Sequence, residues 1–176
     1  MGHQFDIALS FATENQTLVE KVYHYLRAEG FRVFFAPSPE GQAFISGKNQ
    51  REVFYQIFGR EAAYVALFVT RDYIRKDVPM EEASIALTKR AGTDTVIPIY
   101  VDGTPLPADL LDPKQTNYFP SGNPVAIAAH LSARCAPPEP PAPAPSASQK
   151  PGGMYISGNI AEKQVFADKI EGSINL

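Results

Sequence analysis

Apolar and polar residues alternate strictly near the beginning of the chain, from residue 5 to residue 11. The apolar positions are Phe5, Ile7, Leu9 and Phe11, with Asp6, Ala8 and Ser10 between them. This period of two predicts a strand. Beyond it the apolar residues recur at helical spacing, as Leu18, Val19, Val22 and Leu26. Residues 13–16 have the form of a capping box and Gly30 supplies a C-terminal stop, so a helix is predicted between them.

The same alternation of strand-like and helix-like segments continues to residue 135. Further strands are predicted at residues 31–36, 63–70 and 95–101, with a weak one near 117–119. Helices are predicted at residues 48–58, 79–90 and 125–134, and a loop at 36–47. The run 63–70 is almost wholly β-branched and aromatic, which is typical of a strand buried on both faces. Pro98 indicates an edge strand or a bulge in its own strand.

Alternating strands and helices with short connections predict an α/β fold with a mostly parallel sheet covered by helices on both faces. Right-handed crossovers bring every strand-to-helix loop to one edge of such a sheet. Three of these loops follow Phe11, follow Phe35 and span residues 71–78. Ligands of open parallel sheets bind at this carboxyl edge. We therefore expect the functional residues there.

A change of composition divides the chain into three parts, a domain at residues 1–135, a linker at 136–153 and a tail at 154–176. The linker is rich in Pro and Ala and holds seven of the sixteen prolines. In polyproline II it spans up to about 50 Å, as a semi-rigid spacer. The tail repeats the pattern Ile-x-Gly-x-Ile. Two short strands are marginal alone, so the tail is predicted either to pair with another copy or a partner protein, or to remain unstructured.

Charge and composition exclude several classes of protein. Lys and Arg number 16 against 19 Asp and Glu, for a net charge of −3 and a pI near 5.6. This balance lacks the cationic surface of a general nucleic-acid binder. The longest apolar run, residues 62–69, is too short to cross a bilayer, and no secretory signal is evident, so no membrane partner is expected. A single cysteine, Cys135, cannot form an internal disulfide, and a cytoplasmic location is expected.

Common cofactor and metal motifs are absent from the sequence. The first predicted strand is followed by SFATEN, which has no GxGxxG fingerprint, and no GxxxxGK[ST] occurs. A phosphoacceptor domain needs acidic residues where Thr13 and Thr70 stand. The histidines His3, His24 and His130 lack metal-ligand spacing. We therefore expect neither a metal nor a bound cofactor.

Four blocks in order, residues 5–15, 30–35, 45–54 and 64–87, together resemble a bacterial TIR domain. The first is similar to the family's box 1, residues 36–47 to its BB loop, and the last to its third strand and following helix. The fold implied is a flavodoxin-like open parallel sheet of about five strands. Many such domains cleave NAD+ between nicotinamide and ribose, often as antiphage or cell-death effectors that self-associate. Others are only assembly adaptors.

The resemblance also implies site residues. The catalytic glutamate of the family falls on Glu82, with Glu81 as the alternative in register, and the usual tryptophan four residues earlier is Val78. A second frequent tryptophan is Ser46. The implied substrate-binding residues are Ser10, Phe11, Ala12, Phe35, Gly47, Lys48 and Val78. NAD is expected as substrate, with either hydrolysis to ADP-ribose or cyclisation, and a synthase making a cyclic nucleotide signal is a further alternative.

Each of these residues also has a structural interpretation. Acidic residues in the first turn of a helix are stabilised by its dipole, which alone accounts for Glu81 and Glu82. Phe11 and Phe35 are equally compatible with a hydrophobic core. Lys48 is compatible with a solvated surface, and Gly47 with a turn of positive φ. The loss of the tryptophan at Val78 weighs against an enzyme, because Val78 supplies an apolar wall but no stacking face, and the enzyme stays the preferred function.

Overall fold

The computed structural model describes residues 2–112 and 114–135. The linker at 136–153 and the tail at 154–176 lie outside the described residues. Within the described part, five parallel strands form one sheet in the order β2-β1-β3-β4-β5. The strands are β1 Phe5–Phe11, β2 Val33–Phe34, β3 Ala62–Val69, β4 Val96–Tyr100 and β5 Phe119–Pro120. This confirms the predicted flavodoxin-like α/β fold.

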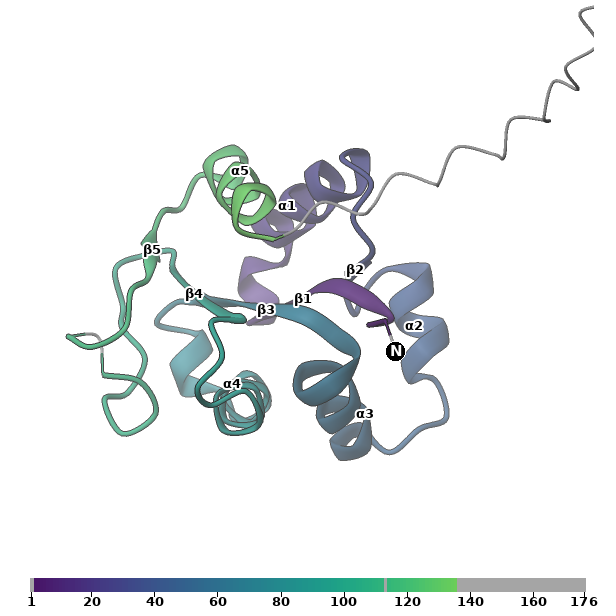
Figure 1. Cartoon of the computed structure of the whole chain (residues 1–176), viewed down its shortest axis with the longest axis horizontal. Helices are drawn as coiled ribbons and strands as arrows, with labels where there is room; N and C mark the ends of the chain where they lie inside the picture. The colour runs from purple at the N-terminus through teal and green to yellow at the C-terminus, as the bar shows by residue number, and fades with distance from the viewer. Residues whose placement is uncertain (1, 113, 136–176) are drawn as a thin grey trace, which may run out of the picture. The chain divides into compact units, whose positions relative to one another are not determined.

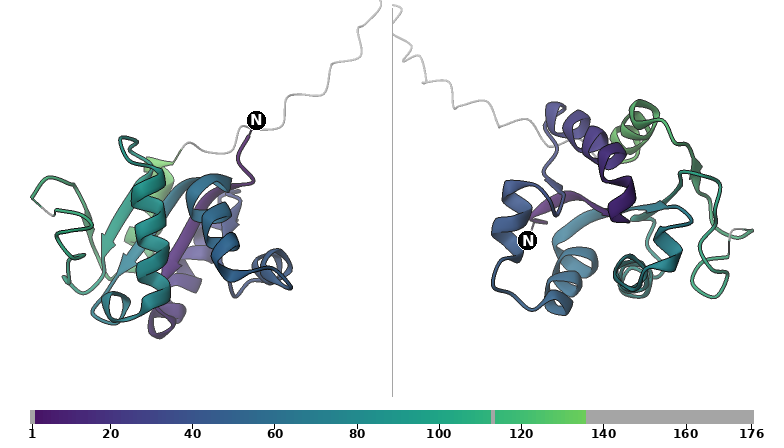
Figure 2. Two further views of the ribbon diagram at one scale, coloured as in Figure 1. Left: turned by 90° about the horizontal axis from the view of Figure 1, so that it is seen from below. Right: turned by 180° about the vertical axis from the view of Figure 1, so that it is seen from behind.

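Helices cover both faces of the sheet (Figure 1). They are α1 Gln16–Ala28, α2 Pro39–Ile45, α3 Gln50–Gln56, α4 Asp77–Lys89 and α5 Pro124–Arg134. Short 3-10 turns, η1 at Thr13–Asn15 and η3 at Tyr73–Arg75, and a π-helical turn, η2 at Ile57–Glu61, complete the connections. Helices α1 and α5 lie on one face and α3 and α4 on the other, as the view from behind also shows (Figure 2).

The alternation along β1 distributes its side chains between two hydrophobic cores. Ile7 and Leu9 pack under α1 and α5 in one core. Ala8 joins the other core, together with residues of α3 and α4. The polar Ser10 therefore faces the α3/α4 side, although it is completely buried. The position of this hydroxyl inside the protein follows directly from the period of two predicted for residues 5–11.

Strand β2 is shorter than the predicted strand at residues 31–36. The amide of Phe31 donates to the carbonyl of Leu26 at 3.1 Å and so closes the end of α1. At the other side, the carbonyl of Phe35 accepts from the amide of Ser38 at 2.9 Å. Backbone groups of Phe31 and Phe35 are thus used by turns, and the residues in register with β1 are Val33 and Phe34.

The predicted loop at residues 36–47 contains a helix, α2, so that prediction was wrong in this respect. Ser38 is its N-cap, and the Ser38 hydroxyl accepts from the amide of Gly41 at 3.0 Å. Pro39 occupies the first helical position, where its missing N–H costs nothing. The sequence Ser-Pro-Glu at residues 38–40 is a helix start signal. The prolines and glycine in this segment favoured a loop in the prediction.

The predicted capping box at residues 13–16 was also wrong. The chain leaves β1 through the 3-10 turn η1, and neither η1 nor α1 begins with a side-chain cap. Asn15 instead accepts a hydrogen bond from the Thr70 hydroxyl at 2.9 Å. The C-terminal stop is confirmed, because Gly30 follows the end of α1 with φ of 94°.

The helix predicted at residues 48–58 corresponds to α3, which begins two residues later. Asn49 is its N-cap and accepts from the amides of Arg51 and Glu52 at 3.0 and 3.3 Å. At its other end α3 continues into η2, which lengthens the helical segment to Glu61. The extra turn brings the chain to the start of β3.

Pro98 lies in β4, which has neighbours on both sides. The carbonyl of Thr95 and the amide of Val101 both point to β3, so alternate residues such as Pro98 point toward β5. Pairing with β5 starts only at Ile99. The side of Pro98 that lacks an N–H therefore faces no paired strand. The edge position predicted for this strand holds only at Pro98.

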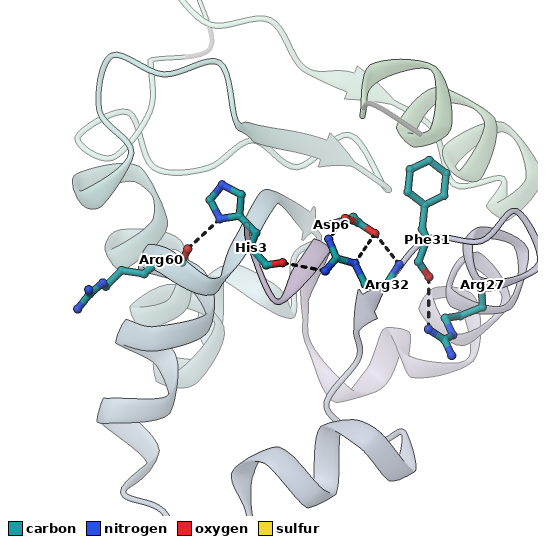
Figure 3. Close-up of polar contacts among 6 residues, drawn as sticks. All are labelled: His3, Asp6, Arg27, Phe31, Arg32 and Arg60. Carbon is teal, nitrogen blue, oxygen red and sulfur yellow. Dashed lines mark hydrogen bonds and ion pairs between the residues drawn. The ribbon is translucent and has the colours of Figure 1, made fainter. Parts of the chain in front are cut away.

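A polar cluster ties β1 to the start of β2 at the amino edge of the sheet (Figure 3). Arg32 contacts both carboxylate oxygens of Asp6, at 2.5 and 3.2 Å, and donates to the carbonyl of His3 at 2.8 Å. The His3 ring contacts the carbonyl of Arg60 at 3.1 Å. Burial tends to raise the pKa of Asp6, but the hydrogen bonds and charge of Arg32 outweigh it and lower that pKa.

Candidate active site

Glu82 of α4 lies next to Ser10 of β1, at the carboxyl edge of the sheet. The Ser10 hydroxyl donates to Glu82 Oε2 at 2.6 Å, although the two residues are 72 positions apart in the chain. Two features of the fold create this contact. Ser10 faces the α3/α4 side from the end of β1, and α4 starts where the chain returns from the neighbouring strand β3.

Tyr73 extends this contact into the protein interior. Its ring is completely buried in η3, and its hydroxyl lies 2.7 Å from Ser10 Oγ. Burial and the nearby charge of Glu82 raise the pKa of Tyr73 well above its ordinary value, and the hydrogen bond between Tyr73 and Ser10 opposes this rise. Tyr73 therefore keeps its proton throughout the physiological range. The three side chains form a continuous line of hydrogen bonds from the core to Glu82.

Glu82 is half-buried, and its carboxyl group points inward to Ser10. Burial raises its pKa to about 8, an effect that the hydrogen bond from Ser10 opposes and the charge of Glu81 reinforces. A carboxyl group with this pKa is largely protonated at neutral pH and becomes ionised just above it. A carboxyl group with a raised pKa is typical of a functional site. The alternative, a structural ion pair with a basic residue, would lower the pKa of Glu82 and therefore does not explain the rise.

Glu81 and Glu82 point in different directions from the first turns of α4. Glu81 pairs with Arg51 of α3 at 2.9 Å, and the Arg51 side chain is 80% exposed. Glu82 instead points to Ser10 and has no basic partner among the described residues. Of the two carboxylates that the sequence left open, only Glu82 lies in a desolvated position at the sheet edge.

Two cross-connections hold the rim of this edge together. Thr70 donates to Asn15 Oδ1 at 2.9 Å and accepts from the amide of Tyr73 at 3.1 Å. Lys76 pairs with Glu14 at 2.6 Å. Both contacts join the turn after β1 to the segment between β3 and α4. They fix the relative positions of the two segments that carry Ser10 and Glu82.

Sequence reasoning missed Tyr73, Thr70 and Asn15. A signal for Tyr73 was present, because a single aromatic residue stands in the charged run RDYIRKD, inside the predicted edge segment 71–78. An aromatic ring in a charged segment is a candidate for an inward-facing position. Thr70 and Asn15 carry no comparable signal, since both are ordinary residues at loop boundaries.

Phe11 and Phe35 lie on the other side of the sheet from Glu82. Their rings stack on each other with centroids 5.4 Å apart, and Phe35 also stacks on Tyr23 at 5.0 Å. Phe35 is only 2% exposed, whereas Phe11 is partly buried. Both rings belong to the core under α1 and α5. Of the pair, Phe11 alone presents surface to solvent at this edge.

The remaining predicted residues differ in their surroundings. Ala12 is completely buried on the α3/α4 side. Gly47 adopts a φ of 75°, and the Lys48 ammonium lies 3.7 Å from the centre of the Phe44 ring. Val78 is 43% exposed, one helical turn before Glu82. Gly47 and Lys48 thus belong to the connection between α2 and α3, whereas Val78 shares a helix face with Glu82.

A cavity of about 680 Å³ opens at the amino end of β4, away from Glu82. Its lining includes Pro98, His130 and Arg134, and none of the predicted substrate-binding residues. The His130 ring stacks on Phe119 at 4.1 Å. Among the described residues, no group of three His, Cys, Asp or Glu side chains is placed to hold a metal ion. None of the described helices has the length and apolarity needed to span a membrane.

Comparison with known proteins gives one family. The sequence profile described as TIR domain matches residues 7–128. A curated relative, the 3′ cyclic ADP-D-ribose synthase AaTIR of Aquimarina amphilecti, is 32% identical over 112 residues, covering 62% of this chain and 33% of the relative. The chain thus spans about a third of the length of that protein.

A solved structure supports the same fold. The TIR domain of the Toll-related receptor TRR-2 from Hydra magnipapillata superposes with a TM-score of 0.53. The sequence identity is 14%, and the match covers 65% of this chain and 82% of that chain. At this identity the likeness concerns the arrangement of strands and helices.

Proposed function

The chain belongs to the TIR domain family, and from this membership we propose that it cleaves NAD+ between nicotinamide and ribose with Glu82 as the catalytic carboxylate. The observation that carries the proposal is the position of Glu82. It is a desolvated carboxyl group at the carboxyl edge, held by a buried hydroxyl and without a basic partner among the described residues. The name of the curated relative supports the same substrate class.

The chemistry needs one carboxylate and no general acid. Nicotinamide is cationic in NAD+, so when the bond from ribose C1′ to nitrogen breaks, the electron pair leaves with a neutral base. The ribose becomes an oxocarbenium ion, whose positive charge a neighbouring carboxylate stabilises. Glu82 is proposed to stabilise this charge and to hold the 2′-hydroxyl. Water then attacks C1′ and loses a proton to solvent, which gives ADP-ribose.

Ionisation of Glu82 is part of this mechanism. The carboxyl group has a pKa of about 8 in the free domain, so only a minor fraction is ionised at neutral pH. A cationic nicotinamide ring beside the carboxyl group favours the charged form and lowers that pKa. Substrate binding and ionisation of Glu82 are thereby coupled, and kcat/KM is expected to rise with pH toward about 8.

Cyclisation is the alternative fate of the same oxocarbenium ion. An adenine nitrogen or a ribose hydroxyl of the ADP-ribose moiety attacks C1′ in place of water, and one proton of the adenine or the hydroxyl is lost to solvent. The name of the Aquimarina relative specifies a cyclic ADP-ribose product. We therefore include cyclic ADP-ribose isomers among the proposed products.

A non-enzymatic adaptor is the competing function, and Val78 favours it. The residue is exposed one turn before Glu82 and offers an aliphatic side chain, where the family resemblance implies an aromatic face for the substrate. An adaptor would self-associate through TIR surfaces and through the tail at residues 154–176 without consuming NAD+. An enzyme would use the same self-association to complete its pocket, as a cytoplasmic antiphage or cell-death effector.

The deciding experiment is chromatography of NAD+ incubated with the full chain. Wild-type protein is expected to release nicotinamide together with ADP-ribose or a cyclic isomer. Glu82→Gln removes the charge at constant shape and is expected to lower turnover at least 100-fold. Glu81→Gln is the matched control, because Glu81 pairs with exposed Arg51, and is expected to keep most of the activity.

Three outcomes separate the candidate functions. Nicotinamide release that Glu82→Gln abolishes supports the nucleosidase, and the second product distinguishes hydrolysis from cyclisation. Turnover that persists in Glu82→Gln shows that another residue is the catalytic carboxylate. Absence of turnover in concentrated, artificially clustered wild-type protein supports the adaptor. Growth of phage-infected cells expressing wild type or Glu82→Gln then tests the effector role.

A further inference from the structure

Tyr73 places a hydroxyl inside the hydrophobic core, where the described contacts give it one side-chain partner, Ser10. Ser10 in turn contacts Glu82 and is itself completely buried. Burying a phenol hydroxyl and a serine hydroxyl side by side is unfavourable unless each is hydrogen-bonded. A phenylalanine and an alanine would fill the same space without needing any hydrogen bond. The pair is therefore better explained by what it does to Glu82.

Chemistry fixes the direction of each hydrogen bond when Glu82 is ionised. A carboxylate only accepts, so the single proton of the Ser10 hydroxyl must point to Glu82. Ser10 Oγ is then left with free acceptor capacity. Tyr73, which keeps its proton, fills it by donating to Ser10. Donation from Tyr73 polarises the Ser10 hydroxyl and makes it a stronger donor to the carboxylate.

We propose that Tyr73 is a positioning residue of the active site, which acts through Ser10 to orient the Glu82 carboxyl group and to stabilise its ionised form. The inference rests on the proposed function, because Glu82 is taken as the catalytic carboxylate. Tyr73 is completely buried, so it acts through Ser10 and not by direct contact with a substrate. Its effect reaches Glu82 through two short hydrogen bonds, of 2.7 and 2.6 Å.

The ring of Tyr73 is held independently of its hydroxyl. Its backbone amide donates to Thr70 Oγ1 at 3.1 Å, and its ring packs in the α3/α4 core. Tyr73→Phe therefore removes the donor and leaves the ring in place. In the variant, Ser10 loses the described partner that fills its acceptor site, and its hydrogen bond to Glu82 weakens.

Other charges around Glu82 remain unchanged in this variant. On α4 itself these are Asp77 and Glu81, and Glu81 pairs with Arg51 of α3. At the rim, Lys76 pairs with Glu14 of η1. None of these side chains touches the Tyr73 hydroxyl in the described contacts. A shift in the ionisation of Glu82 in Tyr73→Phe must therefore pass through Ser10.

The test is a carbon-13 NMR titration of the Glu82 carboxyl group in the full chain, which needs no NAD+. In Tyr73→Phe the midpoint is expected to rise by about half a pH unit or more, and the acid limb of kcat/KM for NAD+ cleavage to move by the same amount. Tyr100→Phe is the matched control, because Tyr100 is a buried tyrosine of the same core whose hydroxyl lies outside this line of contacts. Its midpoint is expected to equal that of wild type.

A double-mutant cycle distinguishes an effect of Tyr73 that is transmitted through Ser10 from a general loosening of the core. In the Ser10→Ala background the Glu82 midpoint is expected to be insensitive to Tyr73→Phe, because the connecting hydroxyl is gone. An unchanged midpoint in Tyr73→Phe, or an equal shift with and without Ser10, overturns the proposal. If Tyr73→Phe does not fold, site-specific 3-fluorotyrosine at position 73, a stronger donor of nearly the same shape, is expected to lower the midpoint, and no change overturns the inference.

The titration also distinguishes the two proposals from each other. If the Glu82 midpoint shifts in Tyr73→Phe but the wild type does not cleave NAD+, the role of Tyr73 toward Glu82 is supported and the nucleosidase is rejected. NAD+ turnover by the wild type, together with an unchanged Glu82 midpoint in Tyr73→Phe, supports the nucleosidase and rejects the proposed role of Tyr73.

Discussion

Glu82 costs the folded domain free energy at the pH at which it is proposed to work. Its pKa is about 8 in the folded state against an ordinary value of 4.5. The unfolded chain therefore ionises first as pH rises, and the folded state loses stability between these two values. Active sites commonly carry such a penalty, because a residue suited to a reaction is seldom the most stable one at its position.

Glu82→Gln is accordingly expected to stabilise the domain at pH 8 while abolishing the proposed activity. The variant has no charge to desolvate, so the free energy of unfolding should rise by about 1–3 kcal/mol at pH 8 and change little at pH 4. Urea denaturation followed by circular dichroism at both pH values measures the difference. Glu81→Gln should change stability by less than about 1 kcal/mol at either pH. Equal stability of Glu82→Gln and wild type at pH 8 would contradict a desolvated carboxyl group.

Some of the individual residues of the site were predictable from the sequence. Ser10 and Glu82 were named from the resemblance, and the structure brings them within 2.6 Å. Tyr73 was not named, since nothing in the sequence indicates which hydroxyl a buried ring will meet. Phe11 and Phe35 were expected near the substrate, and the structure places both rings on the α1/α5 side of the sheet. The period of two along β1 already places Phe11 on the opposite face from Ser10.

Among the elements, α2 packs unusually close to the end of β2. A Cβ atom added to Gly41 would lie 2.3 Å from the Phe35 carbonyl oxygen and 2.9 Å from that of Ala36. Backbone atoms cannot yield as a flexible side chain can. Glycine at position 41 is therefore what allows the first turn of α2 to sit on the strand end, beside the connection that carries Gly47 and Lys48.

Gly41→Ala is expected to lower the free energy of unfolding by about 2–4 kcal/mol, because helix and strand must separate. Urea denaturation measures the loss, and amide chemical shifts should change throughout α2. Gly59→Ala is the matched control. Its added Cβ would meet the Lys89 side chain at 3.5 Å, an ordinary contact, so a small effect is expected. A Gly41→Ala variant as stable as wild type would show that α2 moves freely on the sheet.

The contact of Asp6 with Arg32 joins β1 to β2 at the opposite edge. The pKa of Asp6 is lowered in the folded state, so its contribution is present above the ordinary value of 3.8 and is lost as pH falls through the folded pKa. The Asp6 side chain is only 14% exposed, which limits screening by solvent.

Asp6→Asn is expected to lower the free energy of unfolding by about 1 kcal/mol at pH 7, and by progressively less below about pH 4. Urea midpoints across this pH range test the expectation. Glu40→Gln is the control, because the Arg27–Glu40 pair is 3.7 Å long and both side chains are largely exposed. A loss of stability in Asp6→Asn that is the same at pH 7 and pH 3 would assign the effect to packing instead.

Considered as a whole, the described domain keeps two separate cores on the two faces of one sheet. Ser10, Tyr73 and Glu82 belong to the α3/α4 side, and the aromatic stack of Phe11 and Phe35 belongs to the α1/α5 side. The alternation of strands with α1, α3, α4 and α5, and from it the parallel sheet, followed mainly from apolar periodicity, because each period is set locally. The helix α2, the loss of the capping box and the shortened β2 depended on tertiary contacts, which local patterns do not contain.

Self-association is proposed to complete the pocket, so specific activity should depend on protein concentration. NAD+ turnover per mole of full chain is expected to rise at least several-fold between dilute and concentrated samples, and to rise again on forced clustering. Product chromatography over a dilution series, with size measured in parallel, checks this expectation. Constant turnover per mole over a hundredfold dilution would indicate a pocket that one chain completes alone.

Glu82, which is largely protonated at neutral pH, differs chemically from other carboxyl groups of the domain. Asp6, Glu14 and Asp102 have lowered pKa values, and so remain ionised where Glu82 is not. Diazo reagents esterify the acid form of a carboxyl group and spare the carboxylate. A diazo reagent small enough to enter the site should therefore esterify Glu82 in preference to those three ionised carboxylates at pH 7, which offers a covalent handle for inhibitors and probes.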